Sequence, residues 1–173
     1  HYSASGLTAL SIIYPIQLLM IALVVGTGVG INTAMASKLG EGKRQEADEF
    51  AGVGTFLAVV LWFLFALICW CIMPAYARMS TSSETVVQDV IRYGRIVCVF
   101  SFGLFLESIW TKVLQSGGDM KTPMRAQIIG AITNIVLDPL LIFGMLGLPE
   151  LGISGAAVAT VAGQVAAALI VMK

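Results

Sequence analysis

Three long stretches of this sequence contain no charged residue, and they limit the folds that the chain can adopt. They cover residues 2–37, 50–77 and 151–172. Each is longer than the ~20 apolar residues that an α-helix needs to cross about 30 Å of hydrocarbon. The composition agrees, because 58% of the 173 residues are hydrophobic and 12% are charged, against roughly 25% charged residues in a soluble domain. The chain is therefore predicted to be a membrane protein.

The uncharged stretches favour membrane helices over the strands of a membrane barrel. Barrel strands alternate in polarity over about ten residues, whereas these stretches are longer and continuously apolar. Polar, glycine-containing segments divide the chain, and Pro123 follows one of them in a position that favours the start of a helix. We predict an all-α, polytopic membrane bundle with five transmembrane helices, at about residues 7–37, 49–73, 84–115, 123–147 and 154–172.

The positive charges predict the orientation of these helices, because Lys and Arg are enriched in cytoplasmic loops. One side of the predicted bundle carries Lys38, Lys43, Arg44, Lys121, Arg125 and Lys173. The other side carries Arg78, Arg92 and Arg95. We therefore expect a multi-pass plasma-membrane protein with loops 38–49 and 116–123 in the cytoplasm. Residue 1 is then outside and is a histidine rather than a methionine, so we expect a fragment that lacks an upstream membrane helix.

Motifs of enzymes and cofactor-binding proteins are incomplete in this sequence. Ser154 lies in a Gly-x-Ser-Gly motif typical of an intramembrane serine protease, but His1 is the only histidine that could serve as its base. Asp119 lies in a loop rather than in an aspartyl protease motif, and "GEGKR" lacks the Ser or Thr of a phosphate-binding loop. Neither an enzyme nor a cofactor is predicted, and a net charge of zero does not suggest a nucleic-acid partner. The cysteines are predicted to pack inside helices: Cys69, Cys71 and Cys98.

One face of the fourth predicted helix is small or polar throughout. Its members recur at steps of four, three and four residues: Gln127, Ala131, Asn134 and Asp138. An ionised carboxylate near the centre of a membrane helix costs at least roughly 2.5 kcal/mol on insertion scales, so Asp138 should face the bundle interior or a cavity. Pro139 cannot donate a hydrogen bond to the carbonyl of Ile135, and we expect it to bend the helix beside the acid.

Further polar residues lie at membrane depth in the neighbouring predicted helices. Glu107 is followed by Thr111 on the same face, whereas Lys112 is about 140° around the helix and is a poor partner within it. Thr160, in the last helix, lies at nearly the depth of Asp138. Simple hydrogen-bonded packing between helices is an alternative role for Asn134, Thr160 or Gln127, and a structural ion pair is an alternative role for Glu107.

Glycine and alanine residues recur at helical spacing and predict close packing between helices. The segment "GTGVG" and the series Gly155, Ala159, Gly163 and Ala167 form small faces. Such faces let the backbones of membrane helices approach each other.

Three segments resemble the multidrug and toxic compound extrusion (MATE) family: "GTGVGINTAMASKLGEGK", "LQSGGDMKTP", and "NIVLDPLLIFG" followed by "LGISGAAVATVAGQ". The resemblance implies a transporter of twelve helices in two lobes, which exports organic cations in exchange for sodium ions or protons. Residues 1–173 would form a partial N-terminal lobe, helices two to six. The first helix, with a companion aspartate, and the second lobe would lie outside the chain.

The resemblance also implies roles for individual residues. Asn134, Asp138 and Thr160 match a cation or proton coupling site, which can bind Na+ in this family. Glu107 matches an acidic position of some members, so we expect Glu107, Gln127 and Thr111 to line the cavity or to contact substrate. Asp138 would exchange a proton or cation as the cavity faces alternately inward and outward.

Two other functions remain open from the sequence. One is a lipid-linked or polysaccharide flippase of the same superfamily, which would need several cationic side chains for phosphate, whereas the predicted mid-membrane segments offer Lys112. The other is a non-transporting assembly or signalling subunit, which needs only packing residues. The predicted partners are small organic cations, the lipid bilayer and the remainder of the same protein.

Overall fold

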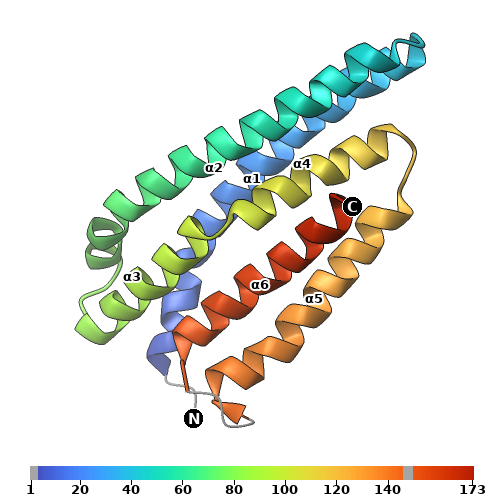
Figure 1. The fold of residues 1–173 in the computed structure, drawn as a ribbon. Coiled ribbons are helices and arrows are strands. Elements are labelled where there is room, and N and C mark those ends of the chain that lie inside the picture. Colours follow the sequence, from blue (N-terminus) through green and yellow to red (C-terminus); the bar gives the residue numbers. More distant parts are fainter. Residues whose placement is uncertain (1–3, 146–149) are drawn as a thin grey trace.

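The computed structural model describes residues 4–145 and 150–173, which form six α-helices and no strand. The all-α prediction is confirmed. The helices run side by side in a slanted bundle (Figure 1). Their bounds are α1 Ala4–Gly40, α2 Arg44–Ser80, α3 Glu84–Val99, α4 Phe102–Ser116, α5 Lys121–Ile142 and α6 Ile153–Val171.

The single helix expected over residues 84–115 is broken into α3 and α4, which meet at an angle of 42°. Two side chains bind the backbone carbonyls at the break. Ser101 Oγ donates to the carbonyl of Cys98 at 2.7 Å, and Trp62 Nε1, from α2, donates to the carbonyl of Val99 at 2.9 Å. These bonds replace helical ones, so the chain can bend without proline. Counted as one bent span, α3 and α4 bring the described helices to five spans, as predicted.

α1 and α2 are longer than expected, with 37 residues each. At a rise of ~1.5 Å per residue, each is about 55 Å long, well beyond the ~30 Å of hydrocarbon. The α1–α2 hairpin therefore extends beyond the other helices at one end (Figure 1). Lys38 and Lys43 pair with Glu41 and Glu46 at its tip, at 2.9–3.7 Å. Because these helices are longer than the apolar layer is thick, the charged side chains of the tip can stay in water.

α6 packs between α4 and α5 through glycine contacts. A Cβ atom on Gly163 would lie 2.7 Å from the carbonyl oxygen of Gly130, in α5, and one on Gly155 would lie 2.5 Å from that of Leu141. On the opposite side, a Cβ atom on Gly103, in α4, would lie 3.0 Å from the backbone nitrogen of Val165. The predicted small face of the last helix therefore serves close packing.

α5 ends at Ile142, five residues before the expected end. Gly144 has φ +65°, a left-handed conformation that terminates helices. The following residues are apolar, which is why hydropathy alone extended the helix; residues 146–149 lie outside the described part. Asp138 is consequently near the end of α5 rather than at its centre. The helix is continuous through Pro139, and the bend expected there stays a prediction.

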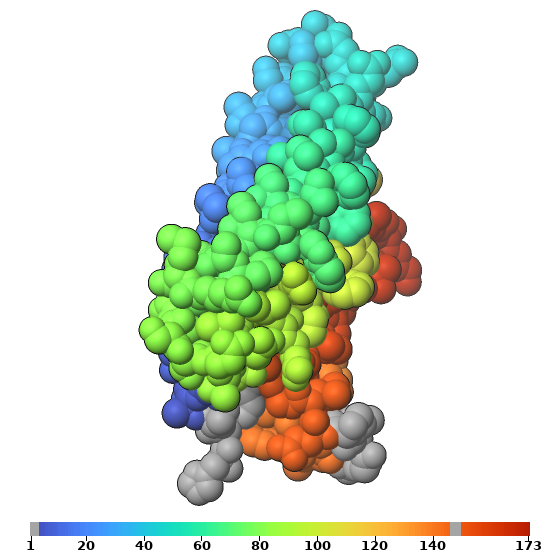
Figure 2. Space-filling view, turned by 90° about the vertical axis from the view of Figure 1, so that its left-hand side faces the viewer, coloured from blue at the N-terminus to red at the C-terminus, as the bar shows by residue number. Residues whose placement is uncertain are grey.

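The two loops predicted to be cytoplasmic, between α1 and α2 and between α4 and α5, lie at the same end of the bundle, together with the C-terminus (Figure 1). The α2–α3 connection lies at the other end. Figure 2 shows a second feature: α2 and α3 form one continuous face of the molecule, with α6 and α5 behind and below. The assignment of the first end to the cytoplasm stays a prediction.

Candidate functional site

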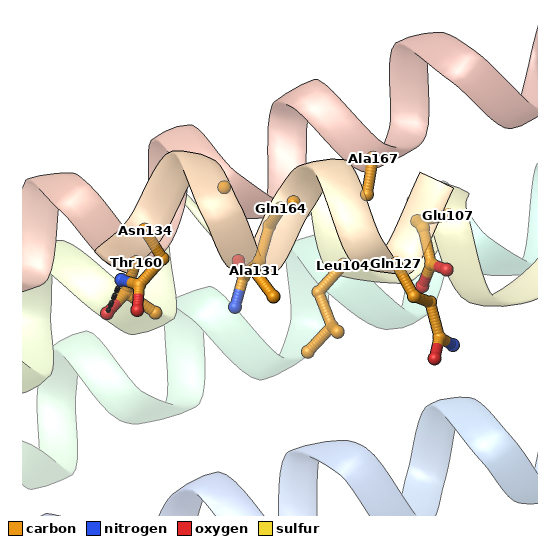
Figure 3. A pocket seen from close by; sticks show the side chains of 10 residues that line it. Leu104, Glu107, Gln127, Ala131, Asn134, Thr160, Gln164 and Ala167 are labelled. Atoms are coloured by element: carbon orange, nitrogen blue, oxygen red, sulfur yellow. Dashed lines mark hydrogen bonds between the residues drawn. The ribbon is translucent and has the colours of Figure 1, made fainter. Parts of the chain in front are cut away.

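A pocket of about 330 Å³ lies among α4, α5 and α6. Four predicted site residues line it together: Glu107, Gln127, Asn134 and Thr160. Figure 3 shows their side chains along α5, with Asn134 and Thr160 at one end and Glu107 and Gln127 at the other. Three of the four members of the predicted face therefore line this polar space, namely Gln127, Ala131 and Asn134.

Asn134 and Thr160 connect α5 to α6 at one end of the pocket. Asn134 Nδ2 donates to Thr160 Oγ1 at 3.5 Å, and Thr160 Oγ1 donates to the carbonyl of Ala156 at 2.9 Å. The Asn134 side-chain carbonyl is left as an acceptor. The side-chain oxygens of Asn134 and Thr160 thus lie close together, and hard cations prefer oxygen atoms as ligands.

Asp138 lies one helical turn beyond Asn134, next to the pocket but outside its lining. Its Oδ1 atom is buried and has no hydrogen-bond partner among the described residues. Buried polar atoms are almost always partnered, so this oxygen is in an unusual state. A proton, a cation, a water molecule or a group from outside the described residues can satisfy it.

Two residues near this end of the site were not predicted from the sequence. Tyr93, from α3, is 4% exposed, and its hydroxyl accepts a hydrogen bond from Gln17 Nε2, of α1, at 3.3 Å. The Tyr93 hydroxyl also lies within interaction range of Thr160 and of Asp138. Gln17 is a polar residue within the first uncharged stretch, and a polar side chain in such a stretch could have indicated a residue of the site. Four helices therefore converge on the Asp138 region.

Glu107 forms the other end of the pocket, where it is 8% exposed. Thr111 Oγ1 donates to Glu107 Oε1 at 3.0 Å, and Gln127 reaches the same carboxylate from α5. Lys112 does not form an ion pair with it within the described residues; its Nζ atom donates to Gln115 Oε1 at 3.0 Å instead. The described part of the chain thus offers no ion pair for the structural alternative at Glu107.

Gln164 is a further pocket residue that sequence reasoning missed. It lies between the two ends of the pocket (Figure 3), and its Oε1 atom is buried without a partner among the described residues. Its spacing of four residues from Thr160 was the signal that could have found it. An unpartnered acceptor in a pocket that also contains a carboxylate favours a ligand that donates hydrogen bonds or carries positive charge.

The fold and the pocket define a multi-pass membrane protein with a polar, carboxylate-containing site inside its helical bundle. The MatE family model matches residues 1–140. The chain belongs to this family, the MATE transporters, and the resemblance seen in the sequence is confirmed.

Individual relatives align with most of the chain. It is 30% identical over 167 residues to the "Probable multidrug resistance protein YoeA" of Bacillus subtilis, covering 96% of this chain and 36% of that protein. It is also 30% identical over 158 residues to the "FAD transporter" of Shewanella oneidensis, covering 90% of this chain and 34% of that protein. A solved structure, described as the inward-facing conformation of a multidrug resistance MATE transporter of the MOP superfamily, matches with a TM-score of 0.91 at 27% identity. That match covers 97% of this chain and 37% of the other. The chain thus spans about a third of these proteins.

Proposed function

We propose that this chain is part of the N-terminal lobe of a secondary active transporter that exports small organic cations in exchange for sodium ions or protons. The observation that supports this proposal most directly is the buried, unpartnered carboxylate oxygen of Asp138, one turn from the Asn134–Thr160 pair. The proposal takes the five spans of the described residues, with α3 and α4 counted as one span, as five of the six in one lobe. The missing helix and a second lobe would complete the transport path.

In this proposal Asp138 is the coupling group. A proton on Asp138 satisfies the buried oxygen in one state, and a sodium ion held by oxygens of Asp138, Asn134 and Thr160 satisfies it in the other. Water or a carboxylate of the missing helix would complete the coordination of a sodium ion, because three oxygens are too few. The loaded and unloaded lobes then favour different conformations, which drives exchange.

Glu107 and Gln127 are proposed to receive the organic cation, with Thr111, which lies outside the pocket lining, holding the Glu107 carboxylate through its hydrogen bond. Among the described residues that line the pocket, Glu107 carries the charge and none is Lys or Arg. Lys112 acts on this carboxylate electrostatically but forms no ion pair with it among the described residues and bonds Gln115 instead, so the pocket lining favours positively charged ligands. The unpartnered acceptor of Gln164 supports the same preference.

An anionic substrate is the second candidate, because one relative is named an FAD transporter. FAD and the phosphate-linked lipids or polysaccharides of a flippase are anionic, so a site for either of them needs cationic side chains. The lining of the described pocket disfavours both. A non-transporting subunit also remains an alternative, since packing alone would use the same small faces.

Vesicles that contain the full-length protein test these alternatives. With an imposed proton or sodium gradient, a fluorescent organic cation should move across the membrane, and FAD or a phosphate-linked lipid should not compete. Competition by FAD at similar concentrations would favour the anion transporter. The absence of any gradient-driven movement would contradict transport itself.

A further inference from the structure

A second pocket, of about 360 Å³, lies on the outer surface of α2 and α3, away from the proposed transport site. Its lining combines two arginines, an amide, an indole and two apolar side chains: Arg92, Arg95, Gln88, Trp70, Ile91 and Ile96. Figure 2 shows the face that α2 and α3 form together. This inference does not depend on the proposed transport function.

The arginines of this pocket lack an anionic partner within the described residues. All ion pairs of that part of the chain lie at the tip of the α1–α2 hairpin. The Arg95 guanidinium stacks on Trp70, with Cζ 4.4 Å from the ring centroid, and its Nε atom is buried without a hydrogen-bond partner there. Stacking positions the guanidinium but does not neutralise it, so the pocket suits an anionic ligand.

Two lengths, each counted from a residue taken as one edge of the hydrocarbon layer, compare the position of the pocket with the thickness of that layer. From Ser116, at the loop end of α4, back to Arg95 is about 29 Å along the bilayer normal, at ~1.5 Å per residue and allowing for the 42° bend. From Phe50, where the uncharged stretch of α2 begins, to Trp70 is about 30 Å at the same rise. Both match the ~30 Å thickness of the apolar layer. With Ser116 and Phe50 taken as one edge of this layer, the arginines lie at the distance where the phosphates of the opposite leaflet begin.

An apolar stripe leads from the pocket toward the centre of the membrane. Phe63, Leu67 and Trp70 follow at steps of four and three residues on one face of α2, and they are 58%, 52% and 50% exposed. A lipid chain can lie along this stripe while its phosphate lies between the arginines. Glu84 and Asp89 lie toward the outer end of α3, beyond the level of Arg92 and Arg95, and Glu84 accepts a hydrogen bond from Gln88 at 2.9 Å.

We propose that this pocket binds the phosphodiester group of a membrane phospholipid, through Arg92 and Arg95, with one acyl chain along the Phe63–Trp70 stripe. Arginine suits this role, because its planar donors match phosphate oxygens in pairs. Tryptophan at the membrane interface suits it as well. The continuous apolar stripe selects a lipid over a soluble phosphate.

The test uses purified full-length transporter in detergent and follows thermal unfolding while a dioleoyl lipid is added. Phosphatidylglycerol and phosphatidylethanolamine should both raise the unfolding temperature, whereas dioleoylglycerol and inorganic phosphate should not. Arg92→Gln should weaken the phospholipid effect at least tenfold, and Arg95→Gln should weaken it further. Arg78→Gln, which removes an exposed cation from the same side of the membrane, should leave it unchanged.

Three results would overturn the proposal. Equal stabilisation by dioleoylglycerol would mean that acyl chains alone bind, and equal stabilisation by inorganic phosphate would mean a site for soluble anions. Unchanged phospholipid binding in Arg92→Gln would mean that the phospholipid binds at another place on the protein. Arg92 is exposed, so this variant should fold even if Arg95→Gln does not.

Discussion

Replacing Gly163 with alanine tests whether the contact between α5 and α6 positions the site. The new Cβ atom would lie 2.7 Å from the Gly130 carbonyl oxygen, and ordinary contacts begin at 3.4 Å, so the helices must separate locally by about 0.7 Å, the difference between the two. The Asn134–Thr160 hydrogen bond is already 3.5 Å long. A separation of this size would break it.

Overpacking of this kind costs about 1–3 kcal/mol. Gly52→Ala, in α2, is the matched control, because a Cβ atom there would meet nothing within 4 Å; it should be neutral or stabilise the helix by up to about 1 kcal/mol. Both variants are compared by reversible unfolding of the full-length protein in lipid or detergent, together with the ion dependence of substrate binding. Equal stability and equal ion dependence in the two variants would refute the role of this contact.

Two other predictions follow from polar groups of the structure. Glu107→Gln should weaken binding of cationic substrates roughly tenfold, or about 1.4 kcal/mol. The unfolding temperature should not fall, since no ion pair to Glu107 is present in the described part. Lost stability with unchanged substrate selectivity would contradict this prediction. Hydrogen bonds from Thr122 and Lys121 hold the pKa of Asp119 below its usual range. The stabilisation of the first turn of α5 should therefore be complete above the unfolded pKa of about 4 and should be lost as the pH falls through the lower folded value. Hydrogen exchange of that turn between pH 2 and 6 would show it, and the same profile in Asp119→Asn would argue against it.

Local sequence patterns were enough to predict the membrane spans and one face of the pocket. The length of an uncharged stretch alone indicates a helix that crosses the bilayer. Spacing at helical intervals predicted that Gln127, Asn134 and Asp138 lie on one side of α5. Thr160 could be matched by its depth in the next helix. These features depend on residues close together in the chain, so periodicity reports them directly.

Features that depend on distant residues could not be predicted in the same way. The break after α3 uses the indole of Trp62, 37 residues before the carbonyl that it binds. Gln17, Tyr93 and Thr160 lie in three different helices, α1, α3 and α6, so their approach likewise depends on how these helices pack. Hydropathy also extended α5 beyond Gly144, because apolar residues continue past the point where the backbone turns.

The central claim is that Asp138 couples ion movement to export. Asp138→Asn retains the size and hydrogen-bonding capacity of the side chain but removes its exchangeable charge, so folding should survive. The measurement is efflux of a fluorescent cation from vesicles with the full-length protein, from pH 5 to 8, with and without sodium, wild type beside Asp138→Asn. Gradient-driven efflux should fall to the level of empty vesicles in the variant, and Asn134→Ala or Thr160→Ala should reduce it less. Full efflux by Asp138→Asn with unchanged ion dependence would contradict the account and place coupling elsewhere in the protein.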